Sequence, residues 1–198
     1  MKIRMTPGAI LLVLVLLFNK SSSFPATVLA ATLHECGHLL AAKLLKIKLI
    51  RLELDLMGAK LYPAAQLPSY MAEGLLAAAG PAASLLLALV PPRSAFWATV
   101  HAATLSFALF NLLPIEGFDG GRMLHALLAA KKGEALAHRV LFVTSYLSLL
   151  HLFSLSACLL LRYGENATLA VLAASLFARL FLTLHPTPHA SPRRIEKK

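Results

Sequence analysis

The segment His34-Glu35-Cys36-Gly37-His38 has the residue types and the spacing of a metal-dependent hydrolase. Residues four apart on an α-helix differ by about 40° in direction, so His34 and His38 can both bind one zinc ion. Glu35 lies at the edge of that face, where its carboxylate can reach a water molecule beside the metal without being a ligand. Zinc lowers the pKa of such a water to about 7, and the carboxylate takes its proton as the water attacks a carbonyl. The pattern predicts a zinc site with its own general base.

This motif lies inside an apolar stretch that runs from Phe24 to Leu45. Ionisable groups at membrane depth are costly and are functional by default. We therefore expect a metal-dependent hydrolase that works inside the lipid bilayer. Cys36 is two residues from each histidine and faces away from their shared side, so we interpret it as a small core residue rather than a fourth ligand.

A catalytic zinc site needs a third protein ligand, and few carboxylates fall in the apolar parts of this chain. Asp119 is the best candidate, because it follows Pro114 and Gly117 in a stretch where we expect irregular backbone. Irregular backbone at membrane depth is tolerated only inside protein or beside a water-filled cavity, which is what a hydrolytic site requires. Glu116 is the alternative ligand and would suit a position at the mouth or gate of the site.

The composition is that of an integral membrane protein. Of the 198 residues, 58% are hydrophobic and 14% are charged, whereas a soluble domain is about 25% charged. The net charge of +10 could indicate nucleic-acid binding, but the positive residues lie between apolar segments rather than on one soluble face, so we expect no nucleic-acid partner. Four histidines stand apart from one another in the sequence, and we interpret them as interface or packing residues: His101, His125, His138 and His151.

The apolar segments predict an all-α polytopic membrane protein with about six transmembrane helices, because a span needs roughly 20 apolar residues. The six segments are 6–18, which is short, 24–45, 70–90, 96–113, 140–161 and 167–184. Between the fourth and the fifth, residues 121–132 read as a short amphipathic segment. We expect one transmembrane domain over 1–184 and a basic, Pro-rich cytoplasmic tail over 185–198.

Most of the Lys and Arg residues fall on one side of this arrangement, the side of the N-terminus. The positive-inside rule then predicts a multi-pass protein of a cell membrane with both termini in the cytoplasm. On that same side, residues 46–56 alternate with a period near two and Gly58 interrupts them, which predicts a small interfacial β-hairpin or sheet. Two interpretations of this segment stay open. It is either a connector whose charges hold it at the lipid headgroups, or a strand whose exposed edge binds an unwound substrate by strand addition.

Three blocks of sequence over about residues 24–125 carry a resemblance to a known family: residues 34–38, Ala79-Gly80-Pro81-Ala82-Ala83-Ser84, and residues 111–121 with their Asp-Gly-Gly end. Together they resemble the site-2 protease family of intramembrane zinc metalloproteases. The family's third-helix motif often ends in Asn, where this chain has Ser84.

The resemblance implies a set of site residues. His34, His38 and Asp119 are the implied zinc ligands, and Glu35 is the implied catalytic base. Asn111 matches a family asparagine that helps to place the substrate or the oxyanion. The alternative for Asn111 is a helix cap or a hydrogen bond between helices.

The run Asn-Leu-Leu-Pro-Ile at 111–115 and the six-span layout look most like the sporulation branch, which cleaves the precursor of a sporulation sigma factor. The resemblance implies a zinc-dependent metalloendopeptidase that cuts in or next to transmembrane segments of protein substrates. Sigma-factor precursors or anti-sigma factors in regulated intramembrane proteolysis are the expected substrates, and regulatory membrane proteins are expected partners. No oligomeric state is favoured.

Two other classes of protein could use the same ligands. A membrane zinc transporter or metal sensor is the first, and a catalytically inactive scaffold that binds substrates is the second. A transporter needs no general base, so Glu35 beside two histidines favours catalysis.

Overall fold

The computed structural model describes residues 2–5, 23–55, 58–65, 67–163 and 174–177. The first predicted span, 6–18, and the tail, 185–198, lie outside the described residues, as does the sixth span, 167–184, except for 174–177. The chain divides into two compact units, Met1–Leu141 and Phe142–Lys198. Each unit is described by itself.

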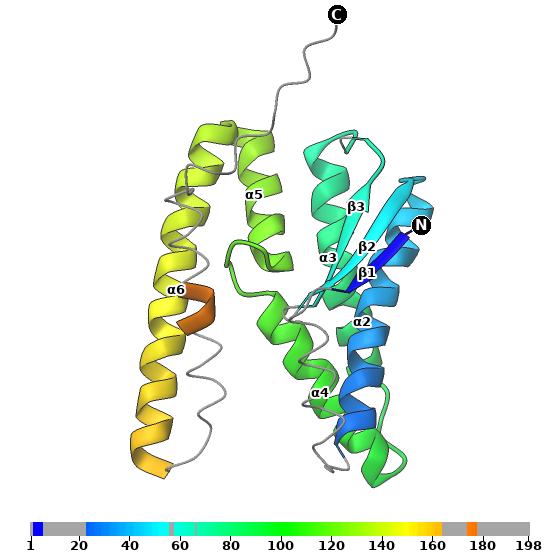
Figure 1. The fold of residues 1–198 in the computed structure, drawn as a ribbon, viewed down its shortest axis with the longest axis vertical. Helices are drawn as coiled ribbons and strands as arrows, with labels where there is room; N and C mark the ends of the chain where they lie inside the picture. The colour runs from blue at the N-terminus through cyan, green and yellow to red at the C-terminus, as the bar shows by residue number, and fades with distance from the viewer. Residues whose placement is uncertain (1, 6–22, 56–57, 66, 164–173, 178–198) are drawn as a thin grey trace, which may run out of the picture. The chain divides into compact units, whose positions relative to one another are not determined.

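The other four predicted spans are helices (Figure 1). They are α2 (Phe24–Leu44), α3 (Tyr70–Ala88), α4 (Ala95–Asn111) and α6 (Glu134–Tyr163), and α6 begins earlier than the predicted 140. The amphipathic segment is α5 (Asp119–Lys132). Within the described residues, two helices are long and apolar enough to cross a membrane, Tyr70–Ala88 and Glu134–Arg162.

The packing of α2 follows a simple rule, in which every fourth residue is buried. The buried stripe consists of Ala26, Ala30, His34, His38 and Ala42, with Gly37 beside it. Residues four apart share one helix face, so small alanines flank both histidines along the same line. Large apolar side chains such as Leu40 and Leu44 are exposed on other sides of the helix.

The centre of the first unit is α3, which packs against α2, α4 and α5. Ser69 caps it, with its hydroxyl accepting a hydrogen bond from the Ala72 N–H at 3.1 Å. Its buried face carries Leu76, Gly80 and Ser84, which are again four residues apart. The core helix of a soluble protein is mostly buried. In α3, only 33% of the most apolar stretch of 18 residues is buried inside the protein.

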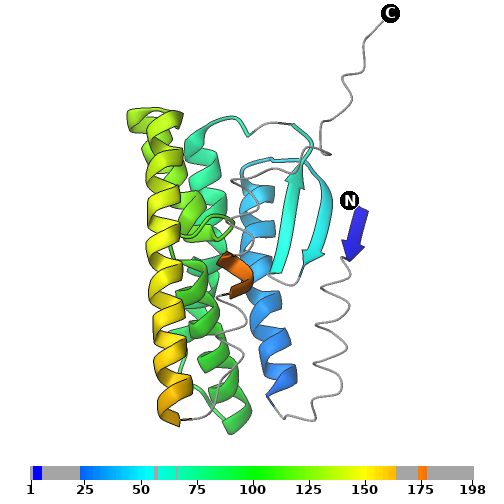
Figure 2. The same ribbon diagram turned by 60° about the vertical axis from the view of Figure 1, so that its left-hand side comes forward.

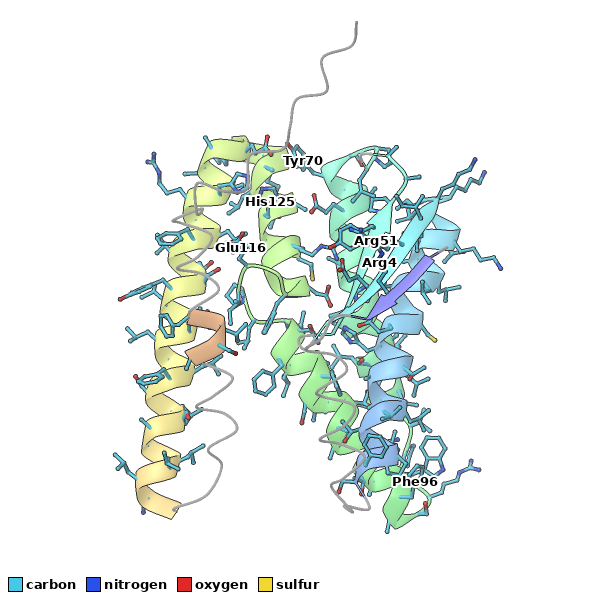
Figure 3. The ribbon with its side chains drawn as sticks, in the orientation of Figure 1. Arg4, Arg51, Tyr70, Phe96, Glu116 and His125 are labelled. Carbon is cyan, nitrogen blue, oxygen red and sulfur yellow. The ribbon has the colours of Figure 1, made fainter. Side chains whose placement is uncertain are left out.

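The predicted hairpin is confirmed, and it belongs to a three-stranded sheet. The strand β2 (Leu49–Asp55) pairs antiparallel with β3 (Gly58–Pro63), and β1 (Lys2–Met5) adds to β2 in parallel (Figure 2). The sequence did not predict β1 as a strand. The charged side chain of Arg51 is held locally, 3.7 Å from the Glu53 carboxylate and 4.0 Å above the Tyr62 ring (Figure 3).

The second unit consists, among its described residues, of the part of α6 that follows Leu141 and a helical turn at 174–177. Phe177 on that turn packs edge to face on two rings of α6. The ring centroids are 6.0 Å from Tyr146 and 6.4 Å from Phe153.

Candidate metal centre

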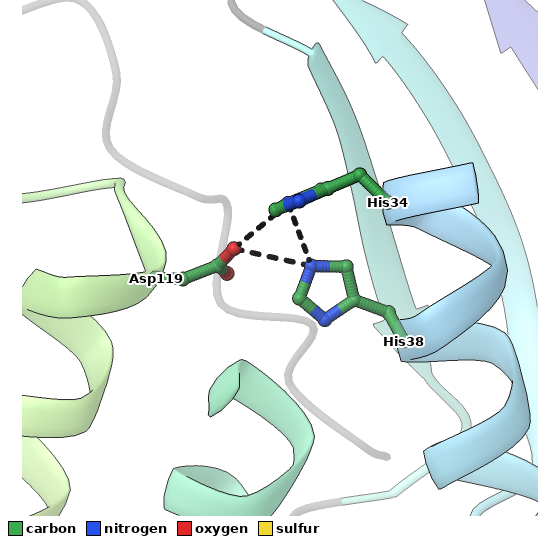
Figure 4. Close-up of side chains that lie close together, drawn as sticks. All are labelled: His34, His38 and Asp119. Carbon is green, nitrogen blue, oxygen red and sulfur yellow. Dashed lines mark hydrogen bonds and ion pairs between the residues drawn. The ribbon is translucent and has the colours of Figure 1, made fainter. Parts of the chain in front are cut away.

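Three side chains that are far apart in the sequence converge in the first unit (Figure 4). Asp119 Oδ2 lies 3.1 Å from Nε2 of His34 and 3.1 Å from Nε2 of His38, and the two Nε2 atoms are 3.3 Å apart. All three residues are buried. The structure therefore brings together the three predicted ligands, and Glu116, the alternative ligand, is exposed and outside the cluster.

The outer ring nitrogens of the histidines are held by α3. His38 Nδ1 donates to the Leu76 carbonyl at 2.8 Å, and His34 Nδ1 is 3.1 Å from the Ser84 hydroxyl. A carbonyl oxygen only accepts, so Nδ1 of His38 carries a hydrogen and its neutral ring presents a lone pair at Nε2. Metal-binding histidines usually donate their other ring N–H to a carbonyl or carboxylate in this way, which fixes the tautomer and the orientation of the ring.

The donor set and its dimensions fit a zinc ion. The Nε2 atoms of His34 and His38 and the Asp119 carboxylate oxygen face one another, so one cation placed among them would contact all three. In a tetrahedral zinc site with bonds of about 2.0 to 2.1 Å, the ligand atoms are about 3.3 Å apart. The observed separations of 3.1 to 3.3 Å agree with that value.

Close helix packing brings α3 up to the histidines. A methyl group at Gly80 would overlap His38 Nε2 and would lie 2.8 Å from His34 Nε2. A methyl group at Gly37 would overlap the Ala79 carbonyl oxygen. Glycine at these two positions is therefore needed for the close approach of α2 and α3.

Asp119 is placed by the first turn of α5. The predicted irregular stretch is present but ends before Asp119, which is the first residue of α5. The irregular part is 112–118, where Gly117 has a φ of 92°. The next residue, Gly120, packs so closely on the preceding loop that a methyl group there would overlap the Leu112 carbonyl oxygen. Arg122, one turn later on α5, lies 3.8 Å from the other Asp119 oxygen.

Three other residues singled out in the sequence, Glu35, Asn111 and Cys36, are not part of the cluster of ligand atoms. Glu35 is half-buried on α2, next to His34 in sequence, with its Oε2 atom buried. Asn111 ends α4 and donates from Nδ2 to the Phe107 carbonyl at 3.0 Å, so this bond is made within its own helix. The ring of Phe107 lies 6.3 Å from that of His34. Cys36 is exposed and outside the cluster, so the expectation of a core position was wrong.

Comparison with known proteins adds two findings to this geometry. Residues 93–155 match the model of peptidase family M50. That region contains Asn111 and Asp119, and the histidine motif lies before it. The fold is similar to a solved structure, the "Site-2 Protease from Methanocaldococcus jannaschii", with a TM-score of 0.62 and 21% identity, over 98% of this chain and 96% of that chain. No curated protein matches the chain.

The two similarities cover different lengths of the chain, 98% for the shared fold and residues 93–155 for the M50 match. The similarity to the archaeal protein shows the fold, and the M50 match falls on the part of the chain that supplies the carboxylate of the cluster. Two polar partners were not predicted from the sequence. Ser84 could have been found, because it follows Gly80 by one turn on the same face of α3, but the carbonyl of Leu76 has no sequence signal.

Proposed function

We propose that this chain is a zinc-dependent intramembrane metalloendopeptidase of the site-2 protease type. The observation that carries the proposal is the buried cluster of His34, His38 and Asp119, whose ligand atoms lie 3.1 to 3.3 Å apart. The M50 match over 93–155 and the shared fold support it. Zinc is favoured by two imidazoles and one carboxylate, because this set with one position left open is the usual catalytic zinc site.

In the proposed reaction His34, His38 and Asp119 hold the metal, which supplies Lewis-acid chemistry when it is bound. The Glu35 carboxylate takes a proton from the attacking water and delivers it to the amide nitrogen of the leaving segment. Leu76 and Ser84 keep the two imidazoles in the orientation that points Nε2 inward. Asn111 has a second amide hydrogen beyond the one given to Phe107, and we assign it to placing the substrate.

The proposed substrates are proteins with a segment in or next to the membrane, and a sigma-factor precursor or anti-sigma factor is the first choice to test. The carbonyls of a substrate helix are shielded by their hydrogen bonds, so the substrate must unwind before attack. An outer edge of the sheet could hold the unwound segment by strand addition. Regulatory membrane proteins are proposed as further partners.

We also propose a multi-pass arrangement in a bacterial cell membrane with cytoplasmic termini. The parallel pairing of Lys2 with Arg51 supports one part of this, because it places the N-terminal strand and the β2–β3 hairpin on the same side. Exposed leucines on α2, α3 and α4 support lipid contact. A transporter or metal sensor is less well supported, because neither requires Glu35 beside the cluster.

The test is cleavage of a tagged sporulation sigma precursor, co-expressed with the wild type or with Glu35→Gln in the same membranes. We expect a shorter product with the wild type, no product with Glu35→Gln, and one zinc per chain at this cluster in both. The matched control is Glu73→Gln, which changes a carboxylate in the first turn of α3, outside the cluster. Cleavage by Glu35→Gln at the wild-type rate would remove Glu35 from the mechanism.

A second measurement separates the metal site from the choice of substrate. Asp119→Ala should lower bound zinc, as determined by elemental analysis of purified protein. Unchanged zinc in that variant would contradict the ligand set, whatever the result with the sigma precursor.

A further inference from the structure

A second group of metal-binding side chains lies in the first unit, apart from the cluster described above. His125 on α5 and two residues of the first turns of α6, Glu134 and His138, place one possible ligand atom each within 4.8 Å of one another. The rings of His125 and His138 have centroids 4.7 Å apart, and His138 Nε2 lies 3.7 Å from Glu134 Oε1. His125 and His138, which stand apart in the sequence, are therefore neighbours in space.

The fold produces this group through the tight connection between two helices. Gly133 alone separates the last residue of α5 from the first residue of α6, and its φ of 87° favours glycine. Glu134 and His138 are four residues apart and share a face of α6. His125 lies about two turns before the end of α5, so the reversal of the chain at Gly133 brings its ring against that face.

One ring nitrogen of the group is left without a hydrogen bond to the described part of the chain. Nε2 of His125 is buried, and it has no hydrogen-bond partner among the described residues. Tyr70 packs edge to face on the same ring, with centroids 6.3 Å apart (Figure 3). A buried polar atom is normally satisfied, and an exception points to a missing water or ion. Glu134 and His138 bring a carboxylate oxygen and a second imidazole nitrogen within 4.8 Å of a ring nitrogen of His125.

We propose that His125, Glu134 and His138 form a second divalent-cation site, of the zinc class, that fastens the end of α5 to the start of α6. Two imidazoles and one carboxylate favour Zn²⁺ over Mg²⁺ or Ca²⁺, which prefer oxygen ligands. The ligand atoms, which all lie within 4.8 Å of one another, must close to the roughly 3.3 Å of a tetrahedral site. This closure is easy, because the side chains of Glu134 and His138 are 63% and 65% exposed.

The charges around His125, Glu134 and His138 lower the affinity of this group for zinc relative to that of the buried cluster. Lys131, Lys132 and Arg139 are exposed close by in the sequence and repel a cation. The buried cluster has a carboxylate that is 9% exposed, whereas this group is open to water on the side of α6. The second site therefore binds zinc more weakly than the first and exchanges it with the medium.

The direct test uses the full-length protein in detergent, purified with a tag that contains no histidine. In the double variant His34→Ala and Asp119→Ala, the buried cluster is disabled, and we expect titration with Co²⁺ to show one remaining equivalent with visible absorption. Adding His138→Gln or His125→Gln to this background should abolish that equivalent. His151→Gln is the matched control, since it removes an exposed histidine of α6 outside the group.

A second measurement covers the case in which the double variant does not fold. Wild-type protein titrated with Zn²⁺ should bind two equivalents, the weaker of which is lost in His138→Gln and kept in His151→Gln. Zinc in excess of the first equivalent should also slow hydrogen exchange at 130–138 in the wild type but not in His138→Gln. A single equivalent in the wild type, or a second equivalent that survives loss of His125 and His138, would overturn the proposal.

The outcome does not depend on proteolysis. The two sites share no ligand, and every readout is metal binding or backbone protection. Failure of cleavage with the sigma precursor would leave this result unaffected, and loss of the second site would leave the buried cluster in place.

Discussion

Gly80 and His38 are in such close contact that a single methyl group on the glycine would overlap Nε2 of the histidine. The methyl group added in Gly80→Ala would therefore displace Nε2 of His38, one of the three ligand atoms of the buried cluster. We expect the zinc content of the purified protein to fall from one equivalent at the buried cluster toward zero, with cleavage lost in parallel.

Gly74→Ala is the control for this variant, because it makes the same change on the same helix. A methyl group at Gly74 would meet only Ala126 Cβ at 3.5 Å, an ordinary contact. Alanine also has the better helix propensity, so Gly74→Ala should bind zinc as the wild type does. Equal zinc in both variants would contradict the close approach of α3 to the histidines.

The hydroxyl of Ser84 is expected to tune the metal site through His34. Ser84→Ala removes the partner of Nδ1, which frees the ring to turn and lowers its basicity. Partners of this kind change metal affinity by about 10- to 100-fold, so we expect a loss in that range when zinc is measured by competition with a chelator. Ser106→Ala is the control, because the Ser106 hydroxyl donates to the Ala102 carbonyl of its own helix at 2.8 Å and is exposed. An unchanged affinity in Ser84→Ala would show that the hydrogen bond has no part in orienting His34.

The site could be predicted from the sequence to the extent that it is local. His34 and His38 share a face of one helix through their spacing alone, and Asp119 was found because carboxylates are rare in apolar segments. The partners from α3 were harder to foresee. A backbone carbonyl such as that of Leu76 has no sequence signal, whereas the position of Ser84 one turn after Gly80 was a signal that the sequence analysis did not use.

The fold shows the same division between local and long-range information. The apolar segments predicted four helices of the described part with small errors at their ends, and the period of two predicted the β2–β3 hairpin. The strand β1 was missed because four residues are too few for a pattern, and its partner β2 lies more than forty residues away. Similarly, the contact between His125 and His138 depends on the reversal at Gly133, which spacing along the chain does not reveal.

The packing of Gly120 should link the position of Asp119 to stability. In Gly120→Ala the added methyl group would overlap the Leu112 carbonyl oxygen and lie 2.7 Å from that of Leu113. Backbone atoms cannot turn aside as side chains do, so α5 must shift, at a cost of about 1 to 3 kcal/mol. We expect a lower Tm in detergent together with weaker zinc binding. Leu127→Ala, an exposed change on the same helix, should leave zinc binding unchanged, and a Gly120→Ala protein with wild-type Tm and zinc affinity would contradict this account.

Lys46 occupies a position where glycine is the better residue. The end of α2 forms a Schellman motif, with Ile47 N–H donating to the Ala42 carbonyl at 2.8 Å and Lys46 N–H to the Lys43 carbonyl at 3.1 Å. Lys46 has a φ of 57°, the left-handed conformation that costs a residue with a side chain about 1 to 2 kcal/mol.

Lys46→Gly should therefore stabilise the protein by about 1 kcal/mol at most. Part of the relieved strain is offset because glycine has more conformational freedom in the unfolded chain. The measurement is the midpoint of unfolding by heat or by SDS in mixed micelles, at fixed zinc concentration. Lys46→Ala is the matched control, because it removes the same charge and keeps the conformational strain, so its midpoint should stay near that of the wild type. If both variants shift equally, the charge of Lys46, and not its backbone conformation, determines the stability of this helix end.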